Sequence, residues 1–139
     1  MEHCAFCDIA ARPGQSVVAW ETPHLLAFAD HRPIRAGHVQ IIPRAHYEVF
    51  DQLPAGLVTE IVMLGQRIAR AQKRLYRVAR VGFAFTGNEV AHVHAHVVPL
   101  HAADDITSGR YADGTASHIS AMIQARTART LRQALEDDV

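Results

Sequence analysis

Three histidines occupy alternate positions late in the chain, at His92, His94 and His96. Residues i, i+2 and i+4 of a β-strand lie on one face, so these imidazoles would form a row with about 7 Å between neighbours. A helix would instead spread them around its axis, and the flanking valines favour a strand. We therefore predict a strand over residues 92–98 that presents three imidazoles on one face.

A row of imidazoles is suited to three kinds of chemistry: it can bind a metal, hold a phosphate or act as a nucleophile. A metal site on a strand usually takes a His-x-His pair and a third ligand from elsewhere. The apolar residues between the histidines give the strand a core face opposite a polar one, which is typical of a surface groove. Strict alternation of three uncommon residues argues against chance. The pattern alone leaves the three uses open.

The composition is that of an ordinary globular protein. The 139 residues are 49% hydrophobic and 20% charged, which is enough for one domain with a hydrophobic core. Fourteen Lys and Arg balance fourteen Asp and Glu, so the charge favours neither a nucleic acid nor a membrane as partner, and we expect neither. No apolar run approaches the roughly 20 residues of a membrane helix, and no signal-peptide pattern is present. We expect a cytoplasmic protein.

Short apolar runs bounded by turn residues predict the strands that accompany the histidines. The runs at 16–20 and 25–29 indicate an antiparallel hairpin, and those at 38–42 and 82–85 indicate a third and a fourth strand. The histidine strand would follow the fourth after a tight turn at 86–89. These elements predict a mainly antiparallel sheet of about five strands.

Helical spacing begins at Pro54. Apolar residues then recur at intervals of three, four and seven, which predicts a helix of about 20 residues; they are Leu57, Ile61, Leu64, Ile68 and Leu75. Residues 101–114 are polar and are predicted to form a loop, with a last helix from about Ser117. We expect an α+β fold, with the long helix packed on the sheet and short helices at both ends.

Arginines recur at every third residue of the last predicted helix. They are Arg126, Arg129 and Arg132. A run of this kind is typical of a solvated helix face, and we predict that role for all three.

The segment His-Val-His-Ala-His-Val-Val at 92–98 matches the signature His-φ-His-φ-His-φ-φ at every position, φ being apolar. The chain resembles the histidine triad (HIT) family, in its bacterial Hint-like branch, over residues 4–100. Further motifs in the family's order are Cys4-x-x-Cys7-Asp8-Ile9, Ala27-Phe28-x-Asp30-x-x-Pro33, Gly37-His38 and Ile41-Ile42-Pro43-Arg44-x-His46. The resemblance implies a HIT-like fold with a HIT domain over 1–100, and a homodimer. The motif says little about residues 101–139, which we expect to form a C-terminal loop and helix extension packed on the same domain.

The resemblance also implies a reaction. The family's bacterial members are nucleotide hydrolases and transferases, and cleavage of a nucleoside 5′-phosphoramidate is the favoured activity. By resemblance His94 is the nucleophile and forms a nucleotidyl-histidine, while a backbone carbonyl fixes its tautomer. His96 would contact phosphate oxygens and help to protonate the leaving group, and the chemistry needs no metal. The alternatives are a dinucleoside polyphosphate hydrolase or nucleotidyl transferase of the same fold, and a non-catalytic nucleotide-binding protein.

Nucleotide-binding residues follow from the same resemblance. Asp30 would bind the ribose hydroxyls, with an ordinary strand-end cap as the alternative. Phe6, Ile9 and Phe28 match positions that pack on a purine, although apolar residues near strands usually belong to the core. His31 would edge the base pocket.

The approach to the triad departs from the family pattern. Asn88 stands where relatives have a glutamine that contacts the phosphate or leaving group, and it is one methylene shorter. Glu89 would repel a phosphate, so we expect it to face away or to contact a leaving-group amine. This departure affects substrate preference more than reaction type.

A second set of residues is suited to a metal. The two cysteines, Cys4 and Cys7, have a Cys-x-x-Cys spacing that is typical of a metal or redox pair. By resemblance, His46 and His92 complete a four-ligand set for tetrahedral zinc, which would be structural because no position stays open. Free, unligated cysteines are the alternative.

Overall fold

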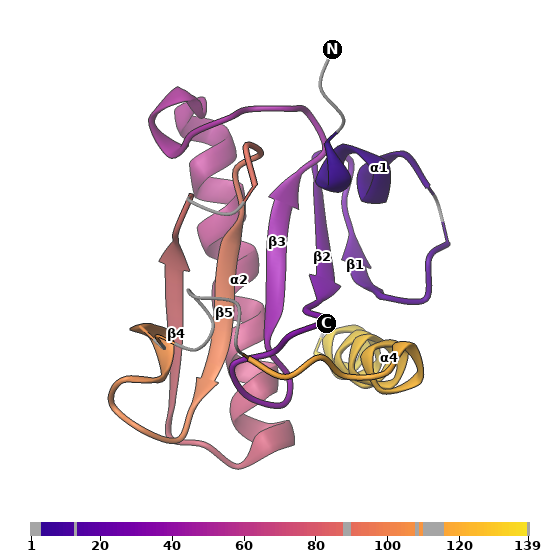
Figure 1. Ribbon diagram of the computed structural model, residues 1–139, viewed down its shortest axis with the longest axis vertical. Coiled ribbons are helices and arrows are strands. Elements are labelled where there is room, and N and C mark those ends of the chain that lie inside the picture. The colour runs from indigo at the N-terminus through magenta and orange to yellow at the C-terminus, as the bar shows by residue number, and fades with distance from the viewer. Residues whose placement is uncertain (1–3, 13, 88–89, 108, 110–115, 139) are drawn as a thin grey trace.

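The structure is a computed structural model that describes residues 4–12, 14–87, 90–107, 109 and 116–138. Within these residues five strands form one sheet in the order β1-β2-β3-β5-β4, with all neighbours antiparallel (Figure 1). The strands are β1 (Val18–Glu21), β2 (Leu25–Ala29), β3 (Val39–Pro43), β4 (Arg80–Phe85) and β5 (Ala95–Leu100). The helices are α1 (Ala5–Ala11), α2 (Ala55–Tyr76) and α4 (Ala121–Asp137), with short 3-10 helices η1 (Phe50–Gln52) and η2 (Asp105–Thr107). The predicted α+β class and five-stranded antiparallel sheet are confirmed.

Side chains of the sheet alternate between two apolar layers. On β2, Leu25 and Ala27 belong to a large core that α2 and α4 complete, whereas Leu26 and Phe28 belong to a smaller cluster with Phe6 of α1. Helices α2 and α4 therefore cover one face of the sheet, and α1 lies on the other.

Polar side chains are buried on the α1 face, where β3 meets β5. Gln40 of β3 pairs with His96 of β5 in the antiparallel register. His38 lies two residues before Gln40 and so on the same face. All three side chains are at most 5% exposed. Buried polar side chains are usually hydrogen-bonded, and the rings of His38 and His96 and the Nε2 of Gln40 have partners in the site.

Helix α2 follows the predicted stripe, with Ile61, Leu64 and Ile68 buried. Leu75 is 37% exposed and does not belong to that stripe, so its placement there was wrong. Gln72, which is also buried, donates from Nε2 to the carbonyls of Gly37 (2.9 Å) and Val97 (3.0 Å). The helix thereby holds the loop before β3 and the strand β5 together.

The histidine segment differs from the predicted strand. Strand β5 begins at Ala95, so only His96 lies in it, and the chain bends at residues 91–92. The pairing of β3 with β5 ends at Ile41, opposite Ala95. Before that point the backbone bonds to another segment, because Val93 N donates to the Tyr47 carbonyl (2.7 Å). The expected strand over 92–98 was therefore wrong at its start.

The C-terminal helix begins at Ala121, four residues later than predicted, because the Ser120 hydroxyl caps it by accepting from Ile123 N (3.1 Å). It has 17 residues and is longer than the expected short terminal helix. Ala128, Leu131 and Leu135 pack it into the large core.

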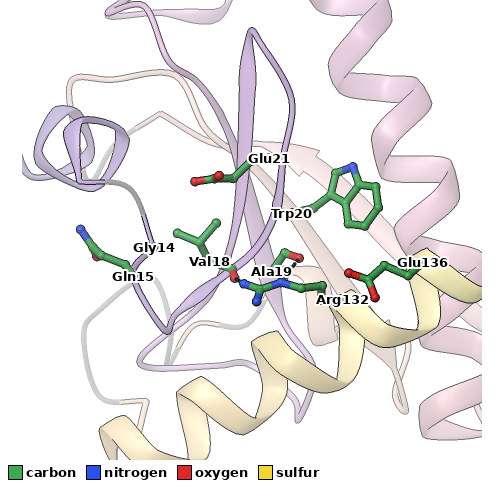
Figure 2. Close-up of a pocket in the computed structure, with 8 residues that line it drawn as sticks. All are labelled: Gly14, Gln15, Val18, Ala19, Trp20, Glu21, Arg132 and Glu136. Atoms are coloured by element: carbon green, nitrogen blue, oxygen red, sulfur yellow. Dashed lines mark hydrogen bonds between the residues drawn. The ribbon is translucent and has the colours of Figure 1, made fainter.

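Arg132 of α4 contacts the edge strand β1. Its guanidinium donates to the carbonyls of Val18 and Ala19, beside a hollow of about 300 Å³ between helix and strand (Figure 2). Arg126 and Arg129 are exposed as predicted. Arg132 is exposed too, so the predicted solvated face holds for all three arginines. The sequence did not indicate the additional contacts of Arg132 with β1. None of the helices in the described residues is long and apolar enough to cross a membrane.

The segment after β5 contains a buried carboxylate where a loop was predicted. Asp105 of η2 accepts from Arg35 Nε (2.9 Å) and Nη2 (3.0 Å), and from the backbone N–H groups of His101 (2.7 Å) and Ala102 (2.9 Å). The hydrogen bonds from Arg35, followed by those from the backbone, lower the pKa of Asp105 to about 2. The ion pair ties η2 to the loop between β2 and β3.

This carboxylate should contribute stability that depends on pH. Because its pKa is lowered in the folded state, the contribution is complete above the ordinary value near 4 and is lost as the pH falls towards 2. We expect Asp105→Asn to lower the free energy of unfolding by about 2 kcal/mol at pH 7, and the difference from wild type to shrink below pH 4. Urea unfolding across this range measures both. Asp104→Asn, at the exposed neighbour, is the control, and an equal loss in both variants would contradict the assignment.

Candidate active site and metal site

The structure brings His92, His94 and His96 together in a buried row, each at most 2% exposed. The ring centroids of His94 and His96 are 5.2 Å apart, with the rings nearly perpendicular. The three rings have different hydrogen-bond partners, and these partners show which nitrogen of each ring carries the proton.

The tautomer of His96 is determined by His38. The backbone N–H of Ile34 donates to His38 Nδ1 (3.0 Å), so the proton of a neutral His38 is on Nε2. That nitrogen lies 2.9 Å from His96 Nδ1 and donates to it. His96 therefore carries its own proton on Nε2, which donates to the Thr86 hydroxyl (3.1 Å).

The tautomer of His94 is the opposite one. Its Nδ1 lies 2.8 Å from the His92 carbonyl, which can only accept, so Nδ1 carries the proton and Nε2 has a lone pair. The Thr86 hydroxyl lies 3.2 Å from this Nε2 and donates to it. Thr86 thus accepts from His96 and donates to His94. The lone pair of His94 Nε2 and the N–H of His96 Nε2 both point at the Thr86 hydroxyl.

Sequence reasoning missed three polar residues that build this arrangement. Thr86 was placed only in a turn, and His38 was noted in a motif without a role. Gln40 was not considered, although a glutamine within an otherwise apolar strand is a signal of a buried polar contact. Its Nε2 donates to Asp30 Oδ2 (2.7 Å).

Asp30 is buried, with its side chain 1% exposed. Besides the bond from Gln40, it accepts from the backbone N–H of Arg32 (2.8 Å), and His38 Nε2 lies 3.5 Å from Oδ2. The bond from Arg32 is that of a cap at the end of β2, which was the alternative considered from the sequence. The ribose contact stays a prediction.

The residues predicted to bind a purine pack against one another. Phe6 meets the rings of Phe28 and His94 edge to face, at 5.3 Å in both cases, and Ile9 packs beside them. His31 is exposed and lies 5.1 Å, ring to ring, from His118. Their contact with a base stays a prediction, and the predictions for Asn88 and Glu89 lie outside the described residues.

A cluster of thiols and imidazoles adjoins the triad. The atoms Cys4 Sγ, Cys7 Sγ, His46 Nδ1 and His92 Nδ1 lie within 4.8 Å of one another. The closer pairs are Cys7–His46 at 3.2 Å, Cys4–His92 at 3.4 Å and Cys7–His92 at 3.5 Å. Tetrahedral zinc with bonds of about 2.0–2.3 Å holds its ligands roughly 3.5 Å apart, so this cluster fits zinc.

The protonation of the cluster also suits a cation. His92 Nε2 donates to the Pro43 carbonyl (2.9 Å), which directs an unprotonated Nδ1 at the thiols. Burial lowers the pKa of His92 and so favours its neutral form. Burial, and next the neighbouring Cys4, raise the pKa of the Cys7 thiol, an effect that a bound cation would reverse.

The sheet and the buried histidines place the chain in the histidine triad class of α+β proteins. The model of the HIT domain family matches residues 12–103, and the chain belongs to this family. It is 31% identical over 105 residues to an uncharacterized HIT-like protein of Methanocaldococcus jannaschii, covering 73% of this chain and 81% of that protein. It is 33% identical over 97 residues to the adenosine 5′-monophosphoramidase of Saccharomyces cerevisiae, covering 69% and 61%.

Solved structures agree with this family. A Zn-bound histidine triad family protein from Mycobacterium smegmatis superposes with a TM-score of 0.75 at 27% identity, covering 96% of this chain and 94% of that one. The diadenosine triphosphate hydrolase of Plasmodium falciparum shares the fold, with a TM-score of 0.73 at 16% identity, covering 88% and 78%.

Proposed function

We propose that the protein hydrolyses purine nucleoside 5′-phosphoramidates through a covalent intermediate on His94. The observation that carries this proposal is the pair of opposite tautomers. His94 Nε2 has the lone pair that attack on phosphorus needs, and His96 Nε2 has the proton that a leaving amine needs. The monophosphoramidase activity of the yeast relative is of the same kind.

The reaction balances with these residues and solvent protons. A phosphate oxygen would replace the Thr86 hydroxyl between the two rings. His94 Nε2 then attacks phosphorus, the P–N bond breaks, and its electron pair stays with the amine, which takes the proton from His96 Nε2 while solvent returns a proton to the ring, so that no imidazolate is left. In the second half, water attacks the nucleotidyl-histidine, His96 passes the proton of that water to solvent, and His94 is released. The His92 carbonyl holds the Nδ1–H of His94 throughout and stabilises the charge that forms on the ring.

The nucleoside would occupy the α1 side of the site. We propose that the base contacts Phe6, Ile9, Phe28 and His31, that Asp30 turns to the ribose and that Asn88 contacts the phosphate. A cytoplasmic location stays a prediction from the sequence.

Loss of the nucleophile should abolish the reaction. We expect His94→Gly to lower kcat/KM for adenosine 5′-phosphoramidate by at least about 10³-fold, and acid-quenched wild type to carry one nucleotidyl group on His94 by mass spectrometry. His24→Asn is the control, because His24 is exposed and pairs with Glu60 on α2. Equal activity of His94→Gly and wild type would contradict the proposal. Turnover of diadenosine polyphosphates alone would favour the alternative hydrolase, and tight nucleotide binding without turnover would favour a binding protein.

We also propose that Cys4, Cys7, His46 and His92 bind one structural zinc ion. The ion would fix the start of α1 to the segment after β3 and to the segment before β5, because its ligands come from all three. Since the carbonyl of His92 orients His94, the zinc site supports the nucleophile without taking part in the chemistry.

Metal analysis tests this assignment. Protein purified without added zinc should contain one zinc per chain, and Cys7→Ser should lower that content. Chelation should lower the thermal midpoint of wild type, because binding free energy of the ion is folding free energy. Cys7→Ser should respond less to the chelator. A metal content near zero with two freely titratable thiols would contradict the assignment.

Homodimerisation through the outer edge of β4 completes the proposal. Arg132 donates to two carbonyls of the edge strand β1, whereas β4 ends the sheet of the described residues on the other side. Phe83 of β4 is 36% exposed and approaches Gly65 of α2, where a Cβ would lie 2.6 Å from its ring. Val62, three residues before Gly65, lies on the same side of the helix and is 39% exposed.

Light scattering should therefore find twice the mass of the chain. We expect Val62→Lys to shift the protein to monomers, because it would bury a charge in the interface. Met63→Lys is the matched control, since Met63 is more exposed (59%) and turned by about 100° around the helix. A monomeric wild type, or dissociation by Met63→Lys alone, would contradict this interface.

A further inference from the structure

A cavity of about 280 Å³ opens beside His94, apart from the residues that we assign to the nucleoside. Its wall is formed by residues 48–51 around η1, by residues 85–87 at the end of β4, and by Val93 and His94. Phe6, Phe28 and Asp30 do not line it. The cavity therefore borders the nucleophile without belonging to the nucleoside side of the site.

Two carboxylates give this cavity a negative charge. Glu48 and Asp51 both line it, and neither makes an ion pair with a Lys, Arg or His of the described residues. A ligand that reached the cavity would meet two anionic groups without an intramolecular counter-ion. Such a place attracts a cation and repels a second phosphate.

The rest of the wall is apolar and aromatic. The rings of Phe50 and Phe85 lie 4.7 Å apart at an angle of 42°, and Val49 and Val93 extend this surface. Phe50 is 51% exposed, so its ring is accessible to a ligand. An apolar wall with carboxylates suits an alkyl or aryl chain that ends in an ammonium group, because rings contact the chain and can also attract the cation.

Thr86 connects this cavity to the two nitrogens that we assign to the reaction. A phosphorus atom held between His94 Nε2 and His96 Nε2 would have its nucleoside on the side of Phe6. The amine on phosphorus would then extend past Thr86, whose hydroxyl contacts both ring nitrogens and which lines the cavity. When the P–N bond breaks, the amine leaves with the electron pair and the proton from His96, and it enters this space.

We propose that the cavity is a leaving-group subsite for amines that carry a second, positively charged group on an apolar chain. The preferred substrates are then nucleoside phosphoramidates of diamines and of similar cationic amines, and not dinucleoside polyphosphates, whose second nucleotide is anionic. This inference rests on the proposed phosphoramidase function and adds the class of its leaving group.

Three adenosine 5′-phosphoramidates of equal chain length test the subsite. Their N-substituents are 5-aminopentyl, pentyl and 4-carboxybutyl, and the full chain is assayed for P–N hydrolysis. We expect kcat/KM to fall in that order, with about 10-fold between the first two at low salt, the effect of roughly 1.4 kcal/mol of electrostatic attraction. The difference should lie mainly in KM and should shrink as ionic strength rises.

Variants connect the preference to the two carboxylates. We expect Glu48→Gln and Asp51→Asn each to reduce the ratio of aminopentyl to pentyl activity, and the double variant to bring it near one. The readout is a ratio within one protein, so a change in overall activity or folding does not affect it. Glu60→Gln is the matched control, because Glu60 is an exposed carboxylate on α2 that does not line the cavity. This variant should keep the wild-type ratio.

The unsubstituted phosphoramidate separates the two proposals. If wild type hydrolyses it but shows a ratio of one, or cleaves diadenosine triphosphate faster than the aminopentyl compound, the subsite is refuted and the phosphoramidase function stands. If wild type cleaves none of the phosphoramidates, both proposals fail.

Discussion

The bond between the Nδ1–H of His94 and the carbonyl of His92 is the interaction on which the rest of the site depends. It leaves the other nitrogen of His94 with a lone pair, and it does so at a fixed ring orientation. The carbonyl is itself held on both sides. The ring of His92 donates to the Pro43 carbonyl, and the following N–H, of Val93, donates to Tyr47. The ring of His94, the proposed nucleophile, is thus oriented by backbone that two further hydrogen bonds immobilise.

The register of β3 against β5 supplies the other half of the site. It sets Gln40 opposite His96, and His38 on the same face can then reach His96 Nδ1. Gln72 of α2 contacts both the loop before β3 and β5 from the opposite face of the sheet. A slip by one residue would turn every one of these side chains to the wrong face. The packing of α2 on the sheet therefore supports the register that places His38 against His96.

Periodicity predicted what is local in this structure and missed what depends on pairing. The strands β1 to β4 and the helix α2 follow apolar patterns that any strand or helix of this kind shows, and the sequence predicted them within a few residues. The start of β5 depends on where its neighbours end, which no pattern within 92–98 reports. The contacts of His38 and Arg132 join segments far apart in the chain. Thr86 meets His94, eight residues later, because the strands β4 and β5 lie side by side. Only the tertiary structure brings such partners together.

The hydrogen-bond chain also limits the charge that the site can accept. One chain of hydrogen bonds runs from the Ile34 N–H to the His92 carbonyl, and each proton in it belongs to one donor. The donors that would meet a phosphate in this chain are the Thr86 hydroxyl and the ring of His96, which are both neutral. A hydrogen bond with an ionised partner is roughly twice as strong as one between neutral groups. A substrate with several negative charges would need ionised donors, whereas neutral donors suit a single negative charge. The carboxylates of Glu48 and Asp51 act in the same direction at the next position along the substrate. The histidines and the adjoining cavity therefore both support the proposed kind of substrate, one with a single anionic phosphate and a leaving group that is not an anion.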